Sequence, residues 1–273
     1  MAEYPALDIQ ILPAADASLP DRLYALLDDF EPSAIHQDED DERWRVFFRT
    51  AALRDGAGRA LAALAGIRTS PLEVADEDWA RRSQENLRAI EAGGLVVAPP
   101  WDVPHGKPVI IIEPSTGFGT GHHATTRLCL LMLQRLDVRG ARVLDVGTGS
   151  GVLALAAWKL GAGDVAAVDN DPDALDNARA NIARNGAAPS IDIICDGLAG
   201  LRIERADIVL ANLTGAMLVR YAAELRGLAL DGGYLIMSGF APADVVVIRT
   251  AFAGLPVIHE SAEGEWAALT IRL

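Results

Sequence analysis

The segment from Val143 to Gly151, Val-Leu-Asp-Val-Gly-Thr-Gly-Ser-Gly, constrains the fold of this chain more than any other. An apolar run passes through Asp145 into three glycines at alternate positions, and an amphipathic run over 152–160 follows directly. Glycine lets the backbone approach a ligand closely and take positive φ values that a Cβ atom disfavours. The pattern therefore predicts a strand, a tight glycine turn and a helix, with a ligand lying against the turn.

A second predicted strand, 165–169, ends in a carboxylate, Asp169, that is placed to accept hydrogen bonds from a ribose. Dinucleotide-binding turns read G-x-G-x-x-G, but here the third glycine comes one residue early and Val152 stands where that glycine would be. This spacing disfavours an NAD-dependent oxidoreductase. The D-x-G-x-G-x-G form resembles the first motif of the class I S-adenosylmethionine (SAM) methyltransferases, which implies a Rossmann-like α/β fold and SAM as the cofactor.

Downstream of the glycine turn, predicted helices and strands alternate. Asp171 is expected to cap the helix that follows Asp169, and Gly186 to end it. Alternation with short connections predicts a doubly wound, mostly parallel sheet with helices on both faces, and a final hairpin would make one edge antiparallel. The expected helices are 172–185, 216–230 and 242–252, and the expected strands are 191–195, 206–211, 234–238, 256–260 and 266–271.

The chain of 273 residues is longer than one minimal methyltransferase domain, so one domain plus an appendage is expected. Alternating apolar residues around helical runs at 18–30 and 57–65 predict a small α+β domain at the N-terminus. The acidic run 38–42 fits a solvated hairpin tip, or else a contact for a basic substrate. The expected division is an α+β substrate-recognition domain over 1–70, a linker helix over 71–92 and the methyltransferase domain over 93–273.

Two apolar segments, 95–98 and 109–113, are expected to form a short hairpin that leads into the second domain. The glycine-rich stretch 115–126 cannot be one regular element, and a helix is expected over 125–136.

Four polar or glycine positions fall at the predicted strand ends. In an open α/β sheet a ligand lies beyond the carboxyl ends of the strands, where the strand order reverses, so these positions should converge on one crevice. Asp145 is expected either to orient the glycine loop or to contact the ligand. Asn212 has two interpretations. It is an ordinary turn residue, or, as the resemblance to class I enzymes that methylate nitrogen implies, its side-chain and backbone carbonyl groups accept hydrogen bonds from a target amine. The four positions are Asp145, Gly147, Asp169 and Asn212.

Composition and charge exclude several functions. A formal net charge of −14 argues against direct DNA binding, because non-specific binding needs clustered basic residues. The same charge suits a basic protein partner, although an acidic surface can also serve only solubility. No apolar run approaches the roughly 18 residues of a membrane span, and no signal-peptide pattern opens the chain, so no membrane association is expected.

Cys129 and Cys195 lack metal-ligand spacing and fit reduced thiols packed in the core of a cytoplasmic protein. Two adjacent histidines, His122 and His123, cannot point the same way on a regular element, and no third ligand is suitably spaced, so no metal site is predicted.

The segment Gly119-Thr120-Gly121-His122-His123-Ala124-Thr125-Thr126 resembles the G-T-G-x-H-x-T-T signature of the PrmA family. These are bacterial methyltransferases of large-subunit ribosomal protein eleven. An acidic-Trp segment (77–79), Val96 to Trp101 and a late Glu265-Trp266 occur in the same order as in the family. The resemblance covers about 72–273 and is weak over 1–70. It implies that Thr126, Gly147, Asp169 and Asn212, with Gly149 of the same turn, contact SAM, and that His123 is the family's loop histidine.

The resemblance implies SAM-dependent transfer of methyl groups to lysine ε-amino groups, and to an N-terminal α-amino group, of a large-subunit ribosomal protein, with Asn212 aiming the amine. Ala124 replaces the usual proline, and 213–215 replace the commoner Ile-Leu-Ala, both on the target side of the pocket. Two alternatives stay open: a methyltransferase acting on another protein lysine or a small-molecule amine, and a SAM-binding module without catalysis.

Overall fold

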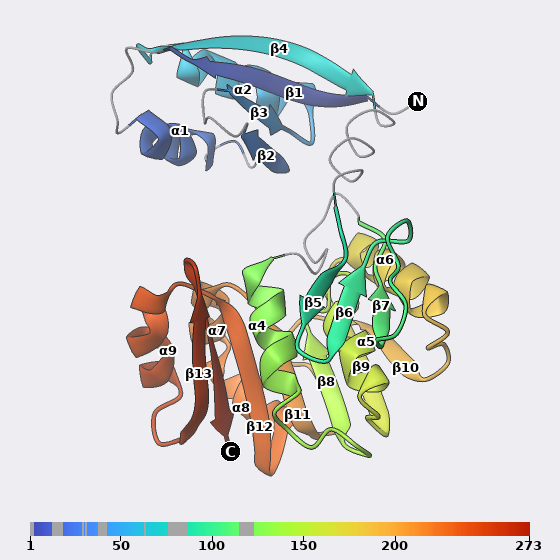
Figure 1. Ribbon diagram of the computed structural model, residues 1–273. Helices are drawn as coiled ribbons and strands as arrows, with labels where there is room; N and C mark the ends of the chain where they lie inside the picture. Colours follow the sequence, from blue (N-terminus) through green and yellow to red (C-terminus); the bar gives the residue numbers. More distant parts are fainter. Residues whose placement is uncertain are drawn as a thin grey trace. The chain divides into compact units, whose positions relative to one another are not determined.

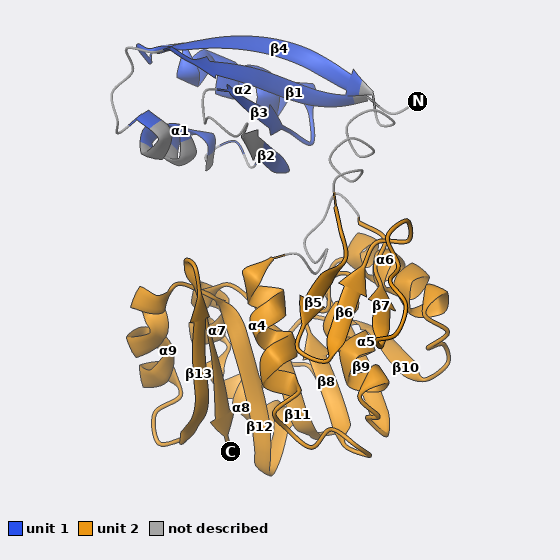
Figure 2. Ribbon diagram, viewed as in Figure 1, with its two compact units in different colours: residues 1–86 blue, residues 87–273 orange. Residues whose placement is uncertain are grey.

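The computed structural model describes residues 3–12, 19–28, 30, 32–37, 43–62, 64–75, 87–114 and 123–273. The chain forms two compact units, residues 1–86 and 87–273, shown in Figure 2. The acidic run 38–42, the stretch 76–86 of the expected linker helix and the signature residues 119–122 lie outside the described residues.

The first unit is an antiparallel sheet with strand order β2-β3-β1-β4, packed against two helices (Figure 1). Its core joins alternate residues of the strands, such as Leu7, Ile9 and Trp44, to Leu23 and Leu61 of the helices. The elements are β1 (Glu3–Ile11), α1 (Leu19–Asp28), β2 (Ala34–Gln37), β3 (Arg43–Phe47), α2 (Ala51–Leu61) and β4 (Ile67–Ala75).

Two boundaries of the first unit differ from the expected ones. Helix α2 begins at Ala51, six residues before the expected start at Ala57, because Thr50 caps it: Thr50 Oγ1 accepts a hydrogen bond from Leu53 N at 3.3 Å. Residues 71–75, expected in the linker helix, extend β4 and pair with β1 through their backbone.

The second unit opens with a three-stranded sheet of β5 (Ile90–Ala92), β6 (Leu95–Ala98) and β7 (Val109–Ile111). The expected hairpin between 95–98 and 109–113 is wrong, since β6 and β7 are parallel. The hairpin is formed by β5 and β6, which Gly93 and Gly94 connect. The segment 99–108 is long enough to carry the chain back to the start of a parallel neighbour, whereas a tight turn joins antiparallel strands.

The central sheet has seven strands in the order β10-β9-β8-β11-β12-β14-β13. The first five are parallel, β14 is antiparallel to β12, and β13 pairs with β14 at the edge (Figure 1). The expected doubly wound, mostly parallel α/β fold with a terminal hairpin is confirmed. The strands are β8 (Arg142–Val146), β9 (Asp164–Asp169), β10 (Ile191–Cys195), β11 (Ala206–Asn212), β12 (Ala229–Phe240), β13 (Val257–Glu263) and β14 (Trp266–Arg272).

Helices cover both faces of this sheet, because successive strand residues point to opposite sides. Val143 packs with α4, α5 and α6 on one face, whereas Leu144 packs with α7, α8 and α9 on the other. The helices are α4 (Ala124–Leu133), α5 (Val152–Lys159), α6 (Pro172–Arg184), α7 (Gly215–Arg220), α8 (Ala222–Leu228) and α9 (Val245–Ala251), which follows the 3-10 turn η1 (Pro242–Asp244).

The sequence predicted both ends of α6 correctly but did not predict that the following helix is interrupted. Asp171 caps α6 by accepting a hydrogen bond from Asp173 N at 3.0 Å, and Gly186 follows its end with a φ of 70°, both as predicted. The expected helix over 216–230 is two short helices that meet at Tyr221, whose φ of −106° and ψ of 22° depart from helical values. Strand β12 begins at Ala229, directly after α8 ends, which is earlier than the expected 234.

Cys129 is buried, as expected, and burial raises the pKa of its thiol, while Cys195 is exposed at the end of β10, contrary to the expected core position. No helix within the described residues is both long and apolar enough to cross a membrane.

Candidate functional site

The carboxyl ends of three neighbouring strands bring the predicted residues together. Strand β8 lies between β9 and β11, and the chain winds outward from it on both sides, so the strand order reverses there. Val146 of β8 pairs in register with Val168 of β9 and with Ala211 of β11. The next residues along the three strands, at the same edge of the sheet, are Gly147, Asp169 and Asn212.

The glycine turn, residues 147–151, is fastened to the end of β9. The backbone N–H groups of Gly147 and Thr148 both donate to Val168 O, at 2.8 and 3.0 Å. The φ values are 69° at Gly147, 54° at Gly149 and 81° at Gly151. L side chains rarely adopt this region, so the turn needs glycine at these positions.

Asp169 lies half-buried beside the glycine turn. Its Oδ2 accepts a hydrogen bond from Gly149 N at 2.9 Å, and its Oδ1 accepts one from Asp171 N at 3.1 Å. A carboxylate offers about four lone-pair positions, so these two bonds fix its orientation and still leave acceptor capacity. Because Asp171 caps α6, Asp169 does not serve as the cap of this helix.

Asp145 is buried beneath the turn and braces it from inside. Its Oδ2 accepts hydrogen bonds from Thr148 Oγ1 at 2.6 Å and from Ala154 N at 3.0 Å, which ties the turn to the first residues of α5. Within the described part of the chain, Asp145 Oδ1 has no hydrogen-bond partner. Burial raises the pKa of Asp145 to about 6; its two hydrogen bonds oppose the rise and the nearby Asp169 charge adds to it.

Asp145 should make the stability of the fold depend on pH. Since its pKa in the folded protein lies above the ordinary 3.8, the folded state binds the proton more tightly than the unfolded chain. The stabilisation of the folded state by the protonated Asp145 is therefore present at low pH and is lost as the pH rises from about 4 to about 6. Asp145→Asn keeps one acceptor oxygen for Thr148 and Ala154 but does not titrate.

Urea unfolding of the wild type and of Asp145→Asn from pH 4 to pH 6 should show their difference in unfolding free energy changing by about 2 kcal/mol. Toward lower pH, the unfolding free energy of the wild type should rise relative to that of the variant. The other titrating groups are common to both proteins and largely cancel, so a difference that stays constant with pH would contradict a raised pKa at Asp145.

Asn212 and Thr126 meet across the site. Thr126 lies in the first turn of α4 and is 2% exposed, and its Oγ1 accepts a hydrogen bond from Asn212 Nδ2 at 3.4 Å. The amide oxygen of Asn212, which is an acceptor, takes no part in this bond. The two residues are far apart in the sequence, so the structure joins the end of the signature segment to the end of β11.

His123 sits at the N-terminus of α4, packed edge-on against Trp266 with ring centroids 4.7 Å apart. Its Nδ1 lies 2.8 Å from Thr125 Oγ1. Burial, and secondarily the charge of Arg127, lowers the pKa of this imidazole. Arg127 forms an ion pair with Glu263. These contacts attach the start of α4 to the tip of the β13–β14 hairpin and assign His123 a packing position.

Gly239, which the sequence analysis did not single out, shapes the backbone after Asn212. A Cβ atom there would collide with the carbonyl group of Leu213, and the φ of Gly239 is 98°. The close approach lets Leu213 N donate to Ser238 O at 3.0 Å, which extends the β11–β12 pairing past the strand end. Nothing local in the sequence around Gly239 signals this contact between two strands.

The described residues contain no group of three or more His, Cys, Asp or Glu side chains arranged to hold a metal ion.

A sequence model for the family described as ribosomal protein L11 methyltransferase (PrmA) matches residues 36–273. The chain is 43% identical over 206 residues to the ribosomal protein L11 methyltransferase of Pelotomaculum thermopropionicum, covering 73% of this chain and 67% of that protein. It is 40% identical over 220 residues to the protein of the same name from Deinococcus radiodurans, covering 73% and 79%. Both sequence identities are well above those at which proteins already belong to one family.

Among solved structures, the ribosomal protein L11 methylase of Lactobacillus delbrueckii subsp. bulgaricus superposes with a TM-score of 0.63 at 29% sequence identity. The match covers 68% of this chain and 97% of that chain.

Proposed function

The chain belongs to the PrmA family of ribosomal protein L11 methyltransferases, and we propose on this premise that it transfers methyl groups from SAM to amines of ribosomal protein L11. The acceptors proposed are lysine ε-amino groups and the N-terminal α-amino group. The observation that carries the proposal is the convergence of the glycine turn, Asp169 and Asn212 at the point where the strand order reverses.

Several features of the site support the proposal of a SAM pocket. Gly147 and Gly149 present backbone without Cβ atoms, and the oriented Asp169 carboxylate has capacity to accept hydrogen bonds from two ribose hydroxyl groups. Thr126 and Asn212 would complete the wall on the side of the target amine. When bound, SAM supplies a methyl group on a sulfonium, which is a strong electrophile without further activation.

The protein must then supply a neutral amine and align it. Deprotonating a lysine whose pKa is about 10.4 costs roughly 4 kcal/mol near neutral pH. A partly desolvated pocket favours the neutral amine and offsets some of this cost. Asn212 Oδ1 would accept a hydrogen bond from the amine and aim its lone pair. This bond would be one part of the alignment of amine and cofactor, which as a whole can contribute roughly 7–11 kcal/mol. No dedicated general base is needed.

The charge of the chain supports a basic protein as substrate. The formal net charge of −14 would steer a basic partner toward the protein, since complementary charges raise the rate of encounter. The proposal assigns recognition of that substrate to the first unit, and it places the enzyme in the cytoplasm, where ribosomal proteins are made.

The test is incubation of the purified protein with methyl-labelled SAM and purified ribosomal protein L11, followed by mass spectrometry of the labelled peptides. The proposal expects methyl groups on lysine and N-terminal amines of L11. Parallel reactions with a whole-cell lysate and with small-molecule amines provide the comparison. Label on another protein or on a small amine, with none on L11, would overturn the substrate assignment while keeping the methyltransferase chemistry.

A further inference from the structure

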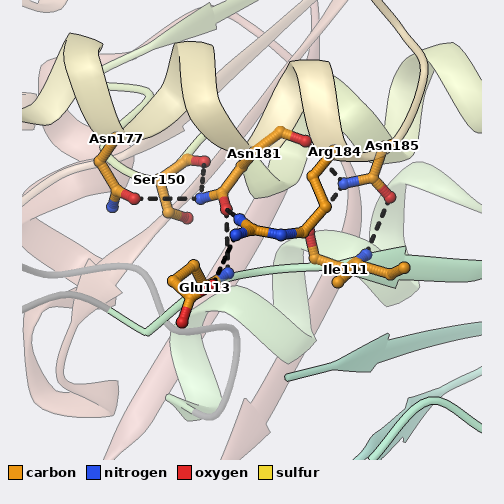
Figure 3. Close-up of polar contacts among 7 residues, drawn as sticks. All are labelled: Ile111, Glu113, Ser150, Asn177, Asn181, Arg184 and Asn185. Carbon is orange, nitrogen blue, oxygen red and sulfur yellow. Dashed lines mark hydrogen bonds and ion pairs between the residues drawn. The ribbon is translucent and has the colours of Figure 1, made fainter. Parts of the chain in front are cut away.

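Helix α6 and its C-cap carry three asparagines four residues apart, Asn177, Asn181 and Asn185, which therefore lie on one face of the helix. Figure 3 shows this face turned toward the chain at the end of β7 and toward Ser150 of the glycine turn. The helix thus meets both the strand that precedes the signature segment and the turn that carries the proposed cofactor site.

Asn181 is the buried centre of this contact, with 0% of its surface exposed. Its Oδ1 accepts hydrogen bonds from Glu113 N at 2.9 Å and from Arg184 Nη1 at 3.4 Å. Its Nδ2 donates to Ser150 O at 3.0 Å and to Asn177 Oδ1 at 3.3 Å. Both acceptor positions and both donor hydrogens of the amide are used, so the side chain has one orientation and connects Glu113 to Ser150 (Figure 3).

Asn185 binds the backbone of β7 itself. Its Oδ1 accepts from Ile111 N at 2.8 Å and its Nδ2 donates to Ile111 O at 2.7 Å. Strand β7 is at the edge of its three-stranded sheet, so this amide satisfies backbone groups that no further strand pairs. Arg184 adds an ion pair with Glu113 at 2.6 Å. These bonds hold β7 without touching the glycine turn.

A second observation shows how closely α6 approaches the glycine turn. A Cβ atom on Gly151 would lie 3.4 Å from the Cβ of Ala178, one helical turn before Asn181. Gly151 has positive φ and caps α5. The bond from Asn181 fixes the Ser150 carbonyl, and so the peptide plane that enters Gly151, while Ala178 blocks the space behind it. The turn is therefore held by β9 on one side and by α6 on the other.

We propose that Asn181 is a positioning residue for the cofactor site: it sets the conformation of the glycine turn by tying Ser150 to the chain at Glu113. The inference rests on the proposed function, because the turn is the part of the site assigned to SAM. Asn181 acts through Ser150 and does not touch the ligand. The contacts of α6 are not part of the glycine motif, whose residues specify only the turn itself.

The test compares Asn181→Ala with Asn185→Ala, two substitutions on one helix face that each remove several hydrogen bonds. For Asn181 one of these bonds goes to residues 111–113, and for Asn185 two do. Both should lower the thermal unfolding midpoint. Calorimetric titration with SAM should show that Asn181→Ala weakens binding about tenfold or more, whereas Asn185→Ala stays within about twofold of the wild type. Equal effects of the two variants on SAM affinity, or no effect of either, would reduce Asn181 to a purely structural residue.

A measurement on the wild type keeps the proposal testable if Asn181→Ala does not fold. Adding SAM should slow amide hydrogen exchange at Glu113, whose N–H bonds to Asn181, more than at Ile111, whose N–H bonds to Asn185. Equal slowing at the two amides, or none, would overturn the inference. Failure of the folded wild type to bind SAM would instead overturn the proposed function, and this inference with it.

Discussion

Replacing Asp169 with alanine should weaken SAM binding by about 10²- to 10⁴-fold. Each hydrogen bond to a charged group contributes roughly 1.5–3 kcal/mol, and the carboxylate is proposed to accept two from the ribose. The substitution also removes the acceptor that holds Gly149 N, so the turn loosens at the same time. Calorimetry with SAM on the folded variant measures the effect, and circular dichroism checks the fold.

Asp171→Ala is the matched control for this prediction. It removes an acid two residues away that caps α6 through Asp173 N. Loss of a helix cap costs about 1 kcal/mol of stability, with SAM affinity expected to stay near that of the wild type. If both substitutions weakened SAM binding equally, helix destabilisation would explain the result and the assignment of Asp169 to the ribose would fail.

Asn212→Ala should lower kcat by about 10²- to 10³-fold, the usual cost of removing one preorganised polar group that acts on the reacting atoms. SAM affinity should fall far less, because Asp169 and the glycine turn stay in place. The separation of kcat from the dissociation constant of SAM is the diagnostic feature. Steady-state methylation of L11 combined with calorimetry measures both quantities, and a loss confined to SAM affinity would remove Asn212 from the alignment of the amine.

The pH dependence of the rate of an Asn212→Asp variant tests the same role of Asn212. A carboxylate at this position would stabilise the ammonium form of the target lysine and raise its pKa, so a smaller fraction would be neutral at any given pH. The pH–rate profile should therefore shift to higher pH relative to the wild type. An unshifted profile would indicate that residue 212 does not face the amine.

The sequence signals that the structure confirms are local ones. The glycine turn, the cap at Asp171 and the stop at Gly186 each depend on a few adjacent residues whose backbone preferences are strong. Alternation of strands and helices then sufficed for the doubly wound sheet, because right-handed crossovers with short loops leave few arrangements. The convergence of Gly147, Asp169 and Asn212 follows from that topology.

The features that sequence reasoning missed depend on contacts between distant segments. No periodic pattern in the sequence indicates these features. They are the direction of β7 relative to β6, the split of the helix at Tyr221 and the approach of Gly239 to Leu213. Asn181 reads in the sequence as an ordinary polar residue in a helix. Only the tertiary structure places its amide between Glu113 and Ser150.

A crystal structure of the protein with S-adenosylhomocysteine would test the central claim most directly. The account predicts the nucleoside against residues 147–151, with both ribose hydroxyl groups about 3 Å from the carboxylate of Asp169 and the sulfur facing Asn212. A nucleoside bound elsewhere on the protein, or a ribose turned away from Asp169, would contradict it.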